Sequence, residues 1–518
     1  MGHVRNPILD GCHPDPSICR VGDEYYLATS SFEYLPGIPI HRSKNLVDWE
    51  IVGHAIDRPD QLDLSGLPGS RGLYAPSLRH HDGRFVVVCT LVGAEGDTSD
   101  RRLGHFVVTA QDPAGPWSDP VWIEGAGGID PSVTFVDGRV WLCGTRLAEP
   151  GRWSGQTDVW LVELDPDSFQ TLSEPVVIWQ GAMIGAVWAE GPHLYPRPGG
   201  GWMLVAAEGG TSRDHAVCVA YADEITGPYR PDLANPRLSH RDLGNEAEIV
   251  DVGHADLVEG PDGRWWATVI AVHAENGANG LLGRQTHLVP VGWEDGRPLF
   301  APGVGRVERT LADDALPDRA ASEESAGFRD DFDEAVLARE WTAVGRMPHT
   351  FVDLAARPGW ARLAASDVDA SRVGDLAYLG RRLPAERGCV RADVEWSPGA
   401  RAGLLLRVSE DAFFEVSVGD EDVVVRIREK GEMRVLCERR RDDATGASDA
   451  TGAGAAALEI ELDGFAATAR VDGVDLAHAD LRRLAPDGDG TFVGAWVGVV
   501  AVGAGVVDVD AIEMRALS

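Results

Sequence analysis

The N-terminal part of the chain repeats one pattern five times. In each repeat, a short turn that contains glycine separates two runs of β-branched and aromatic residues, which is typical of a β-hairpin. The starts recur at intervals of about sixty residues, slightly above the period of known propeller repeats. The repeats begin at His13, Tyr74, Ile129, Glu190 and Gly253.

Each repeat also has a second half that reads as a strand, a polar turn and another strand. The segment VWLVELDPDSFQTLSEPVVIW is one example. Four strands in each of five repeats predict a five-bladed β-propeller over residues 1–310. One large β-sandwich with chance internal similarity is the alternative.

The rest of the chain differs in pattern from the repeats. Residues 311–327 are polar and lack periodicity, which predicts a linker. Residues 328–518 show strand-like alternation, for example in GCVRADVEWSP, and no convincing helical period. We therefore expect a second all-β domain, a β-sandwich of the jelly-roll, concanavalin-like type. The predicted fold class is all-β throughout.

The composition limits the partners. The formal net charge of −35 argues against nucleic acid and anionic membranes, because phosphates require basic patches. A neutral substrate fits this charge, although an acidic excess can also serve solubility alone. No stretch is long and apolar enough to span a bilayer.

The cysteines indicate the compartment. They are odd in number, scattered, and never arranged as CxxC, so neither a zinc site nor a disulfide framework is expected. The N-terminal sequence contains no apolar run of signal-peptide length. We expect a reducing, cytoplasmic location. The seven residues are Cys12, Cys19, Cys89, Cys143, Cys218, Cys389 and Cys437.

Three carboxylates occupy related positions in the repeats. The first strand of a propeller blade lines the central axis, so equivalent positions of these strands converge. Alignment of the repeats on their prolines places Asp15 and Asp130 at the converging level, with Glu190 one position before Gly191. In the fifth repeat the alignment leaves His254 and the following alanine open.

Clustered carboxylates raise one another's pKa, which is costly unless function uses it. Glycosidic cleavage needs one carboxylic acid to protonate the leaving oxygen and one carboxylate to activate water or attack. A third carboxylate can tune the pKa of the acid. For one isolated Asp-Pro-Ser, an Asx-type turn is the alternative interpretation.

The segments HPDPSICRVGDEYYLATS, GIDPSV, AEGPHLY, GHADLV and LGRQT resemble glycoside hydrolase family 43. The nearest branch contains β-xylosidases and α-L-arabinofuranosidases with a C-terminal β-sandwich, and the resemblance covers essentially the whole chain. It implies an inverting mechanism with Asp15 as general base, Glu190 as general acid and Asp130 as pKa modulator. Inversion implies that the base and acid carboxyls lie roughly 6.5–9.5 Å apart.

The resemblance also implies substrate-binding residues. Arg284 matches an arginine that bonds sugar hydroxyls, with a surface ion pair as the alternative. His254 matches an axial histidine that holds water or calcium, with a packed core histidine as the alternative. Phe32 and Tyr74 match aromatic residues that stack on sugars, with core packing as the alternative. Trp496 is expected to close the pocket from the second domain, which favours removal of one terminal sugar.

The expected activity is an exo-acting pentosidase, with β-1,4-xylosidase action on short xylo-oligosaccharides preferred. An α-L-arabinofuranosidase, or both activities together, is the alternative. Cys12, Tyr74 and Gln285 depart from many relatives, which have Phe, Trp and Glu there, and these departures bear on the pentose. No cofactor is expected to be required, and a structural Ca²⁺ stays open because some relatives hold one.

The sequence disfavours two other classes of function. A retaining, fructan-cleaving propeller hydrolase is disfavoured, because the chain has HPDPS and EGP instead of that group's motifs. A non-catalytic sugar-binding propeller would be expected to lack at least one of the three carboxylates, and all three are present.

Overall fold

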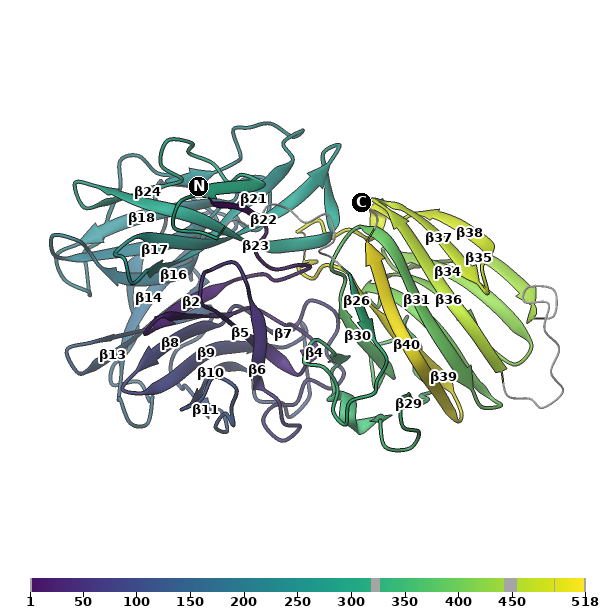
Figure 1. Cartoon of the computed structure of the whole chain (residues 1–518). Coiled ribbons are helices and arrows are strands. Elements are labelled where there is room, and N and C mark those ends of the chain that lie inside the picture. The colour runs from purple at the N-terminus through teal and green to yellow at the C-terminus, as the bar shows by residue number, and fades with distance from the viewer. Residues whose placement is uncertain (1, 318–326, 442–453, 489, 517–518) are drawn as a thin grey trace.

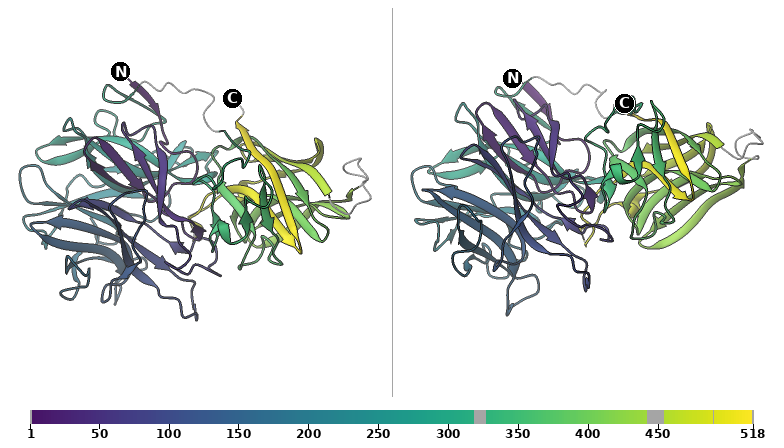
Figure 2. Two further views of the ribbon diagram at one scale, coloured as in Figure 1. Left: turned by 60° about the horizontal axis from the view of Figure 1, so that its bottom comes forward. Right: turned by 90° about the horizontal axis from the view of Figure 1, so that it is seen from below.

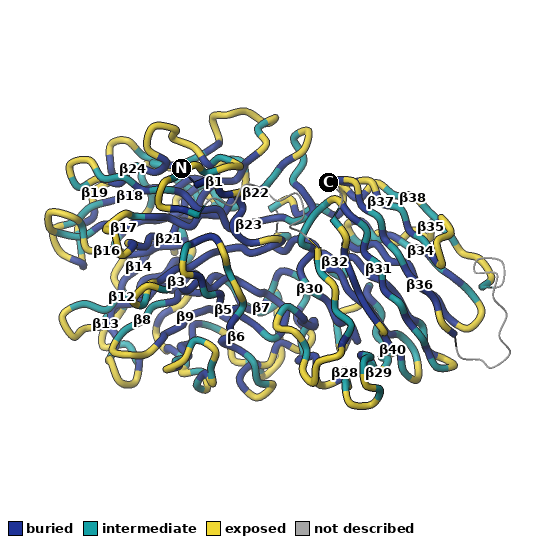
Figure 3. Tube along the Cα trace, viewed as in Figure 1, coloured by how far each residue is buried: buried dark blue, intermediate teal, exposed yellow. Residues whose placement is uncertain are grey.

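A computed structural model describes residues 2–317, 327–441, 454–488 and 490–516. These residues form two domains that lie side by side and are built almost entirely of strands (Figure 1). Exposed positions gather at the turns, whereas the strands are largely buried in both domains (Figure 3). No helix among the described residues has the length and apolar character of a membrane span.

The first domain is a five-bladed β-propeller, as the repeats predicted. Each blade is an antiparallel sheet in which strand order follows the sequence. Blade one contains β2 (Ser17–Val21), β3 (Glu24–Ala28), β5 (Gly37–Ser43) and β6 (Glu50–Ile56). Blade two contains β8 (Ser77–His81), β9 (Arg84–Val92), β10 (Gly104–Ala110) and β11 (Val121–Trp122), with β7 (Gly72–Leu73) beside β9.

The other three blades follow the same plan. Blade three contains β12 (Ile129–Val136), β13 (Arg139–Leu147), β14 (Thr157–Leu164) and β15 (Val176–Trp179). Blade four contains β16 (Glu190–Pro196), β17 (Trp202–Glu208), β18 (Ala216–Ala222) and β19 (Arg230–Pro231), with β20 (Leu238–Ser239) beside β18. Blade five contains β21 (Ile249–Glu259), β22 (Trp265–Glu275), β23 (Ala278–Glu294) and β24 (Arg297–Phe300).

Neighbouring blades are held together by buried hydrophobic clusters. Ile40 and Val87 belong to the cluster between blades one and two, and Ile18 and Leu288 to the cluster between blades five and one. Further clusters lie between the remaining pairs of blades. Because both faces of a blade are buried, its strands read as nearly continuous apolar runs, as in RFVVVCTLV.

The N-terminal segment closes the ring. Strand β1 (Gly2–Arg5) pairs with β25 (Thr310–Asp313), which follows the last blade. Asn6 then bonds both backbone groups of Leu288, each at 2.9 Å. The linker was predicted to begin at residue 311. Residues 311–313 instead belong to strand β25, which pairs with β1 and closes the ring. Residues 318–326 of that linker lie outside the described part of the chain.

The second domain is a β-sandwich of two antiparallel sheets over one large core. In β31, buried and less buried residues alternate, as the sequence pattern predicted. One sheet contains β28 (Val352–Asp353), β29 (Ala361–Ala364), β40 (Val506–Ala516), β31 (Arg387–Trp396), β36 (Gly454–Asp463), β37 (Ala466–Val471) and β38 (Val474–Asp480), with β26 (Phe328–Asp330) beside β40. The other contains β30 (Tyr378–Arg382), β39 (Trp496–Gly503), β32 (Ala400–Ser409), β33 (Ala412–Val418), β34 (Asp422–Glu429) and β35 (Glu432–Arg440). Two short 3₁₀ turns are η1 (Pro348–Thr350) and η2 (Arg482–Leu484).

The two domains share a buried interface, and both views of Figure 2 show them in contact. Strand β4 (Tyr34–Leu35) of the propeller pairs with β27 (Ala343–Val344) of the second domain. Arg407 of the sandwich donates to Glu33 Oε1 at 2.9 Å and to the Tyr34 hydroxyl at 2.8 Å. Glu33 and Arg407 are both buried, so this ion pair fixes the second domain against the propeller.

We predict that Arg407→Ala strongly destabilises the protein. Burial raises the pKa of Glu33, and Arg407 is the cation that opposes this rise. Without Arg407 the buried carboxyl loses its charged partner, and such losses cost about 3–5 kcal/mol. Chemical denaturation would measure the change in the free energy of unfolding.

Arg42→Ala is the matched control, because the Arg42–Glu50 pair is exposed. Exposed pairs contribute about 0–1 kcal/mol. Equal, small effects of the two substitutions would contradict the role given to Arg407.

Candidate active site

The first strands of the blades bring their starting residues to the propeller axis. Four positions there share a left-handed backbone, with φ of 55° at Asp15, 54° at Asp130, 55° at Gly191 and 49° at His254. This shared conformation places His254, and not the following alanine, at the fifth repeat's position. The pairing register also shifts at the start of β12, β16 and β21. Such bulges re-aim side chains, which explains why these residues face the axis.

Asp15 is held in a network suited to its ionised form. Its side chain is almost completely buried, and Ser30 Oγ donates to Oδ2 at 2.5 Å. Arg284 Nη1 donates to Oδ1 at 2.7 Å, and His254 Nδ1 lies 3.7 Å from the same oxygen. Burial alone would raise the pKa of Asp15, but Arg284, His254 and Ser30 together hold it below its usual range. Asp15 is therefore a carboxylate, as a general base must be.

Glu190 is in the opposite electrostatic state. Its enclosure in the site raises its pKa well above the usual range, and the nearby charges of Asp130 and Asp15 raise it further, while Arg284 opposes the rise. The side chain therefore keeps its proton at a pH where an ordinary glutamate has lost it. A protonated carboxyl beside an ionised one is the pairing that acid–base glycoside cleavage requires.

Hydrogen bonds on both sides of Glu190 fix its backbone. The carbonyl of Ala189 accepts from Thr145 Oγ1 at 2.6 Å and from Thr157 Oγ1 at 2.9 Å. The N–H of Gly191 donates to Asp130 Oδ2 at 3.0 Å. Blade three thus positions the acid of blade four.

Asp130 links the two other carboxylates. Burial raises its pKa, Asp15 adds to the rise, and His254 opposes it. Through Gly191 it contacts the segment that carries Glu190, and through its charge it raises the pKa of that residue. The modulating role that the family resemblance implies for Asp130 stays a prediction.

Arg284 lies between two aromatic rings. Its guanidinium is 5.5 Å from the ring centre of Phe32 and 5.4 Å from that of Phe492, and its Nε donates to the Phe492 carbonyl at 3.2 Å. Arg284 is buried, so the surface ion pair considered as its alternative is excluded. Phe32 is also buried. Its contact with a sugar stays a prediction.

A cavity of about 940 Å³ is lined in part by Glu190. Tyr74, Glu190 and Phe492 line it, and Ile129, the neighbour of Asp130, lines it too. The Tyr74 hydroxyl accepts from Arg71 Nη1 and donates to the Ser70 carbonyl, both at 3.0 Å, so its ring is held at the wall.

Trp496 does not reach this cavity, so the prediction that it closes the pocket is wrong. It is only 1% exposed and stacks on Tyr34 with ring centres 4.2 Å apart, inside the domain interface. Phe492, four residues earlier, takes the expected place. The backbone N–H of Phe492 donates to Ser70 Oγ at 2.9 Å, and its ring contacts those of Phe32 and Tyr74. The sequence identified the segment of the second domain that reaches the cavity but not the residue. Strand β39 begins at Trp496, and the side chain of Trp496 is buried in the domain interface.

The surroundings of His254 do not suit a calcium ion. Ca²⁺ takes six to eight oxygen ligands. The nearby carboxylate of Asp15 is already bound by Arg284 and Ser30, and the His254 ring packs on Gly191, where a Cβ would lie 3.0 Å away. In the described ranges, no three His, Cys, Asp or Glu side chains are grouped as metal ligands.

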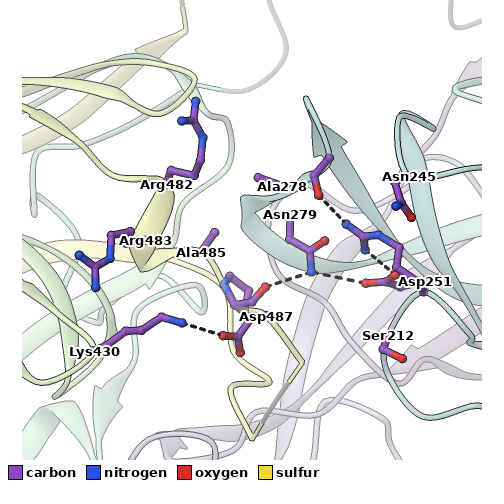
Figure 4. A pocket seen from close by; sticks show the side chains of 13 residues that line it. Ser212, Asn245, Asp251, Ala278, Asn279, Lys430, Arg482, Arg483, Ala485 and Asp487 are labelled. Atoms are coloured by element: carbon purple, nitrogen blue, oxygen red, sulfur yellow. Dashed lines mark hydrogen bonds and ion pairs between the residues drawn. The ribbon is translucent and has the colours of Figure 1, made fainter.

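A second cavity, of about 630 Å³, lies at the junction of blade five and the sandwich (Figure 4). Asn279 donates to the Pro486 carbonyl at 3.0 Å and to Asp251 Oδ2 at 3.4 Å, and Lys430 pairs with Asp487 at 3.3 Å. These contacts fasten the start of the segment that leads to Phe492. These contacts hold residues 486 and 487 between blade five and the turn that follows strand β34.

A propeller axis that brings Asp15, Asp130 and Glu190 together fits the acid–base cleavage of a glycosidic bond. Comparison with family models agrees. The model described as glycosyl hydrolases family 43 matches residues 4–298, and that of the β-xylosidase C-terminal concanavalin A-like domain matches residues 329–515. The chain belongs to glycosyl hydrolase family 43.

Relatives span most of the chain. A xylosidase/arabinosidase of Butyrivibrio fibrisolvens is 38% identical over 80% of this chain and 80% of its own. A non-reducing end α-L-arabinofuranosidase of Bacteroides ovatus is 35% identical over 97% of this chain and 92% of its own. The crystal structure of a xylan β-1,4-xylosidase from Bacillus halodurans C-125 matches 99% of this chain and 100% of its own, with a TM-score of 0.87 and 28% identity.

We predict that Asp130→Asn moves the basic limb of the pH–activity profile to lower pH. Activity requires protonated Glu190, so it is lost as the pH rises through the pKa of Glu190. Removal of the Asp130 charge takes away one cause of the raised pKa. The measurement is kcat/KM against pH on a pentoside with a poor leaving group.

Asp137→Asn is the matched control, since Asp137 lies in the exposed turn of the same blade and also has a positive φ, of 49°. A basic limb that stays in place in Asp130→Asn would contradict the modulating role of Asp130.

Proposed function

We propose that the protein is an inverting exo-glycosidase that removes one terminal pentose, with β-1,4-linked xylo-oligosaccharides as its preferred substrates. The observation that carries this proposal is that Asp15 is held ionised at the propeller axis, while its charge helps to keep Glu190, which lines the cavity, protonated. Phe492 of the second domain lines that cavity, and its carbonyl accepts a hydrogen bond from Arg284 Nε at 3.2 Å, so the second domain supplies part of the wall.

The proposed reaction is a single displacement. Asp15 takes a proton from a water molecule, and the water oxygen forms a bond to the anomeric carbon. The bond between that carbon and the glycosidic oxygen breaks, while Glu190 gives its proton to the departing oxygen. The products are a pentose of inverted anomeric configuration and the rest of the oligosaccharide, which is one sugar shorter and carries a new hydroxyl group. The chain's own carboxyls supply both proton transfers, so we propose that hydrolysis needs no cofactor.

Arabinofuranose is the second candidate for the terminal sugar. The Bacteroides ovatus relative named as an α-L-arabinofuranosidase aligns over nearly the whole chain. The Butyrivibrio fibrisolvens relative carries both activities in its name. Xylosidase and arabinofuranosidase action by one pocket therefore belongs to the proposal.

We also propose a cytoplasmic location. All seven cysteines are free thiols, and five of them are buried, as suits a reducing compartment. Such a location fits an enzyme that processes short, imported oligosaccharides instead of polymeric xylan.

We predict that Glu190→Gln lowers kcat/KM on xylobiose by about 10²–10⁴, the range that general acid catalysis contributes. The loss should be much smaller on 4-nitrophenyl β-D-xyloside, because nitrophenolate leaves without protonation. Glu174→Gln, at an exposed position, is the control and should match the wild type on both.

Assays of xylobiose, 4-nitrophenyl β-D-xyloside and 4-nitrophenyl α-L-arabinofuranoside with the wild type decide between the pentoses. Inactivity on all three would overturn the proposed function. Equal losses of Glu190→Gln on good and poor leaving groups would overturn the role of Glu190.

A further inference from the structure

Trp188 lies two residues before the catalytic acid and lines the same cavity. Its side chain is 41% exposed, although tryptophan is among the most heavily buried residues on average. It precedes the first residue of β16, so it stands beyond the end of the axial strand. The catalytic mechanism above does not use it.

The backbone of Trp188 is held in an unfavourable conformation. Its φ is +51°, which is a genuine outlier for a bulky residue. The N–H of Trp188 donates to the Gly155 carbonyl at 2.7 Å, and the N–H of Gly209 donates to the Val187 carbonyl at 2.9 Å. Loops of blades three and four thus fix this strained residue from both sides.

Two glycines make room for the indole ring. A Cβ on Gly155 would lie 3.2 Å from Nε1 of Trp188, and a Cβ on Gly210 would lie 3.0 Å from Cδ1. The indole therefore lies against two residues without side chains, while 41% of Trp188 is exposed. An immobilised aromatic ring with a free surface is a stacking platform.

The direction of the reaction places the leaving group beside this ring. Glu190 and Trp188 line the cavity, whereas Asp15 is 5% exposed and is not one of its lining residues, so the open part of the site lies on the Glu190 and Trp188 side. The terminal pentose lies on the Asp15 side of the bond that Glu190 protonates. The departing part of the substrate must then lie on the Trp188 side.

Two exposed leucines also line the cavity. Leu103 and Leu147 line it and are 43% and 57% exposed, although both are large hydrophobic residues. They come from blades two and three, whereas Trp188 comes from the segment before blade four. Three exposed apolar side chains from separate segments therefore meet in one cavity.

We infer that Trp188, supported by Leu103 and Leu147, forms the subsite for the leaving sugar and stacks on the C–H face of a xylopyranosyl unit. This inference deepens the proposed function and rests on it. The ring binds the leaving unit equally in the ground state and in the transition state, so it acts on KM more than on kcat.

The test compares xylobiose with β-D-xylopyranosyl fluoride, which has the same terminal sugar but no leaving sugar. In Trp188→Ala, the ratio of kcat/KM for xylobiose to kcat/KM for the fluoride should fall about tenfold, mainly through a higher KM for xylobiose. Trp188→Phe, which retains a ring, should recover most of this loss. Trp360→Ala, at a tryptophan of the second domain that packs on Arg357, is the control and should leave the ratio unchanged.

A fall in kcat on xylobiose with an unchanged KM would overturn the inference, because it would mean that Trp188 only positions Glu190. An unchanged ratio in Trp188→Ala would overturn it as well. Wild-type inactivity on both xylobiose and the fluoride would instead be a failure of the proposed function, so the two failures are distinguishable.

Discussion

The buried ion pair between Asp15 and Arg284 is the interaction on which the rest of the site depends. The two residues are 269 positions apart and meet because the N-terminal segment runs beside β23 of blade five. The N–H of His13 donates to the Arg284 carbonyl at 3.1 Å, so the N-terminal segment that closes the ring also carries Asp15 to Arg284. The pair keeps Asp15 ionised despite its burial, and the resulting charge helps to keep Glu190 protonated. This one ion pair therefore helps to keep Asp15 ionised and, through the charge of Asp15, Glu190 protonated.

The second domain takes part in the site and is not an appendage. The buried Arg407–Glu33 pair and the Tyr34–Trp496 stack fix it against blade one. With that anchor in place, the segment before β39 brings Phe492 to Arg284 and to the pocket wall. The propeller contributes the three carboxylates, and the second domain contributes Phe492 to the wall of the cavity that Glu190 lines. A domain with no carboxylate at the site can therefore still influence which sugar enters.

Much of this arrangement was predictable from sequence, for physical reasons. The propeller and the convergence of Asp15, Asp130 and Glu190 follow from a repeat whose first strand always starts at the axis. Three features were not predictable in this way. The strand β25 is four residues long and forms only because β1 is available as its partner. The choice of Phe492 over Trp496 depends on where β39 starts. The exposure of Trp188 depends on Gly155 and Gly210, which contact it only in the folded chain.

In the proposed mechanism, Asp15 acts as a base on water and not as a nucleophile on the sugar. Proton NMR of freshly released xylose, recorded during the first turnovers of a β-D-xyloside before mutarotation, tests it most directly. Inversion predicts that α-xylose appears first and that the β anomer grows in later. Initial release of β-xylose would mean a covalent intermediate and would contradict the role of Asp15.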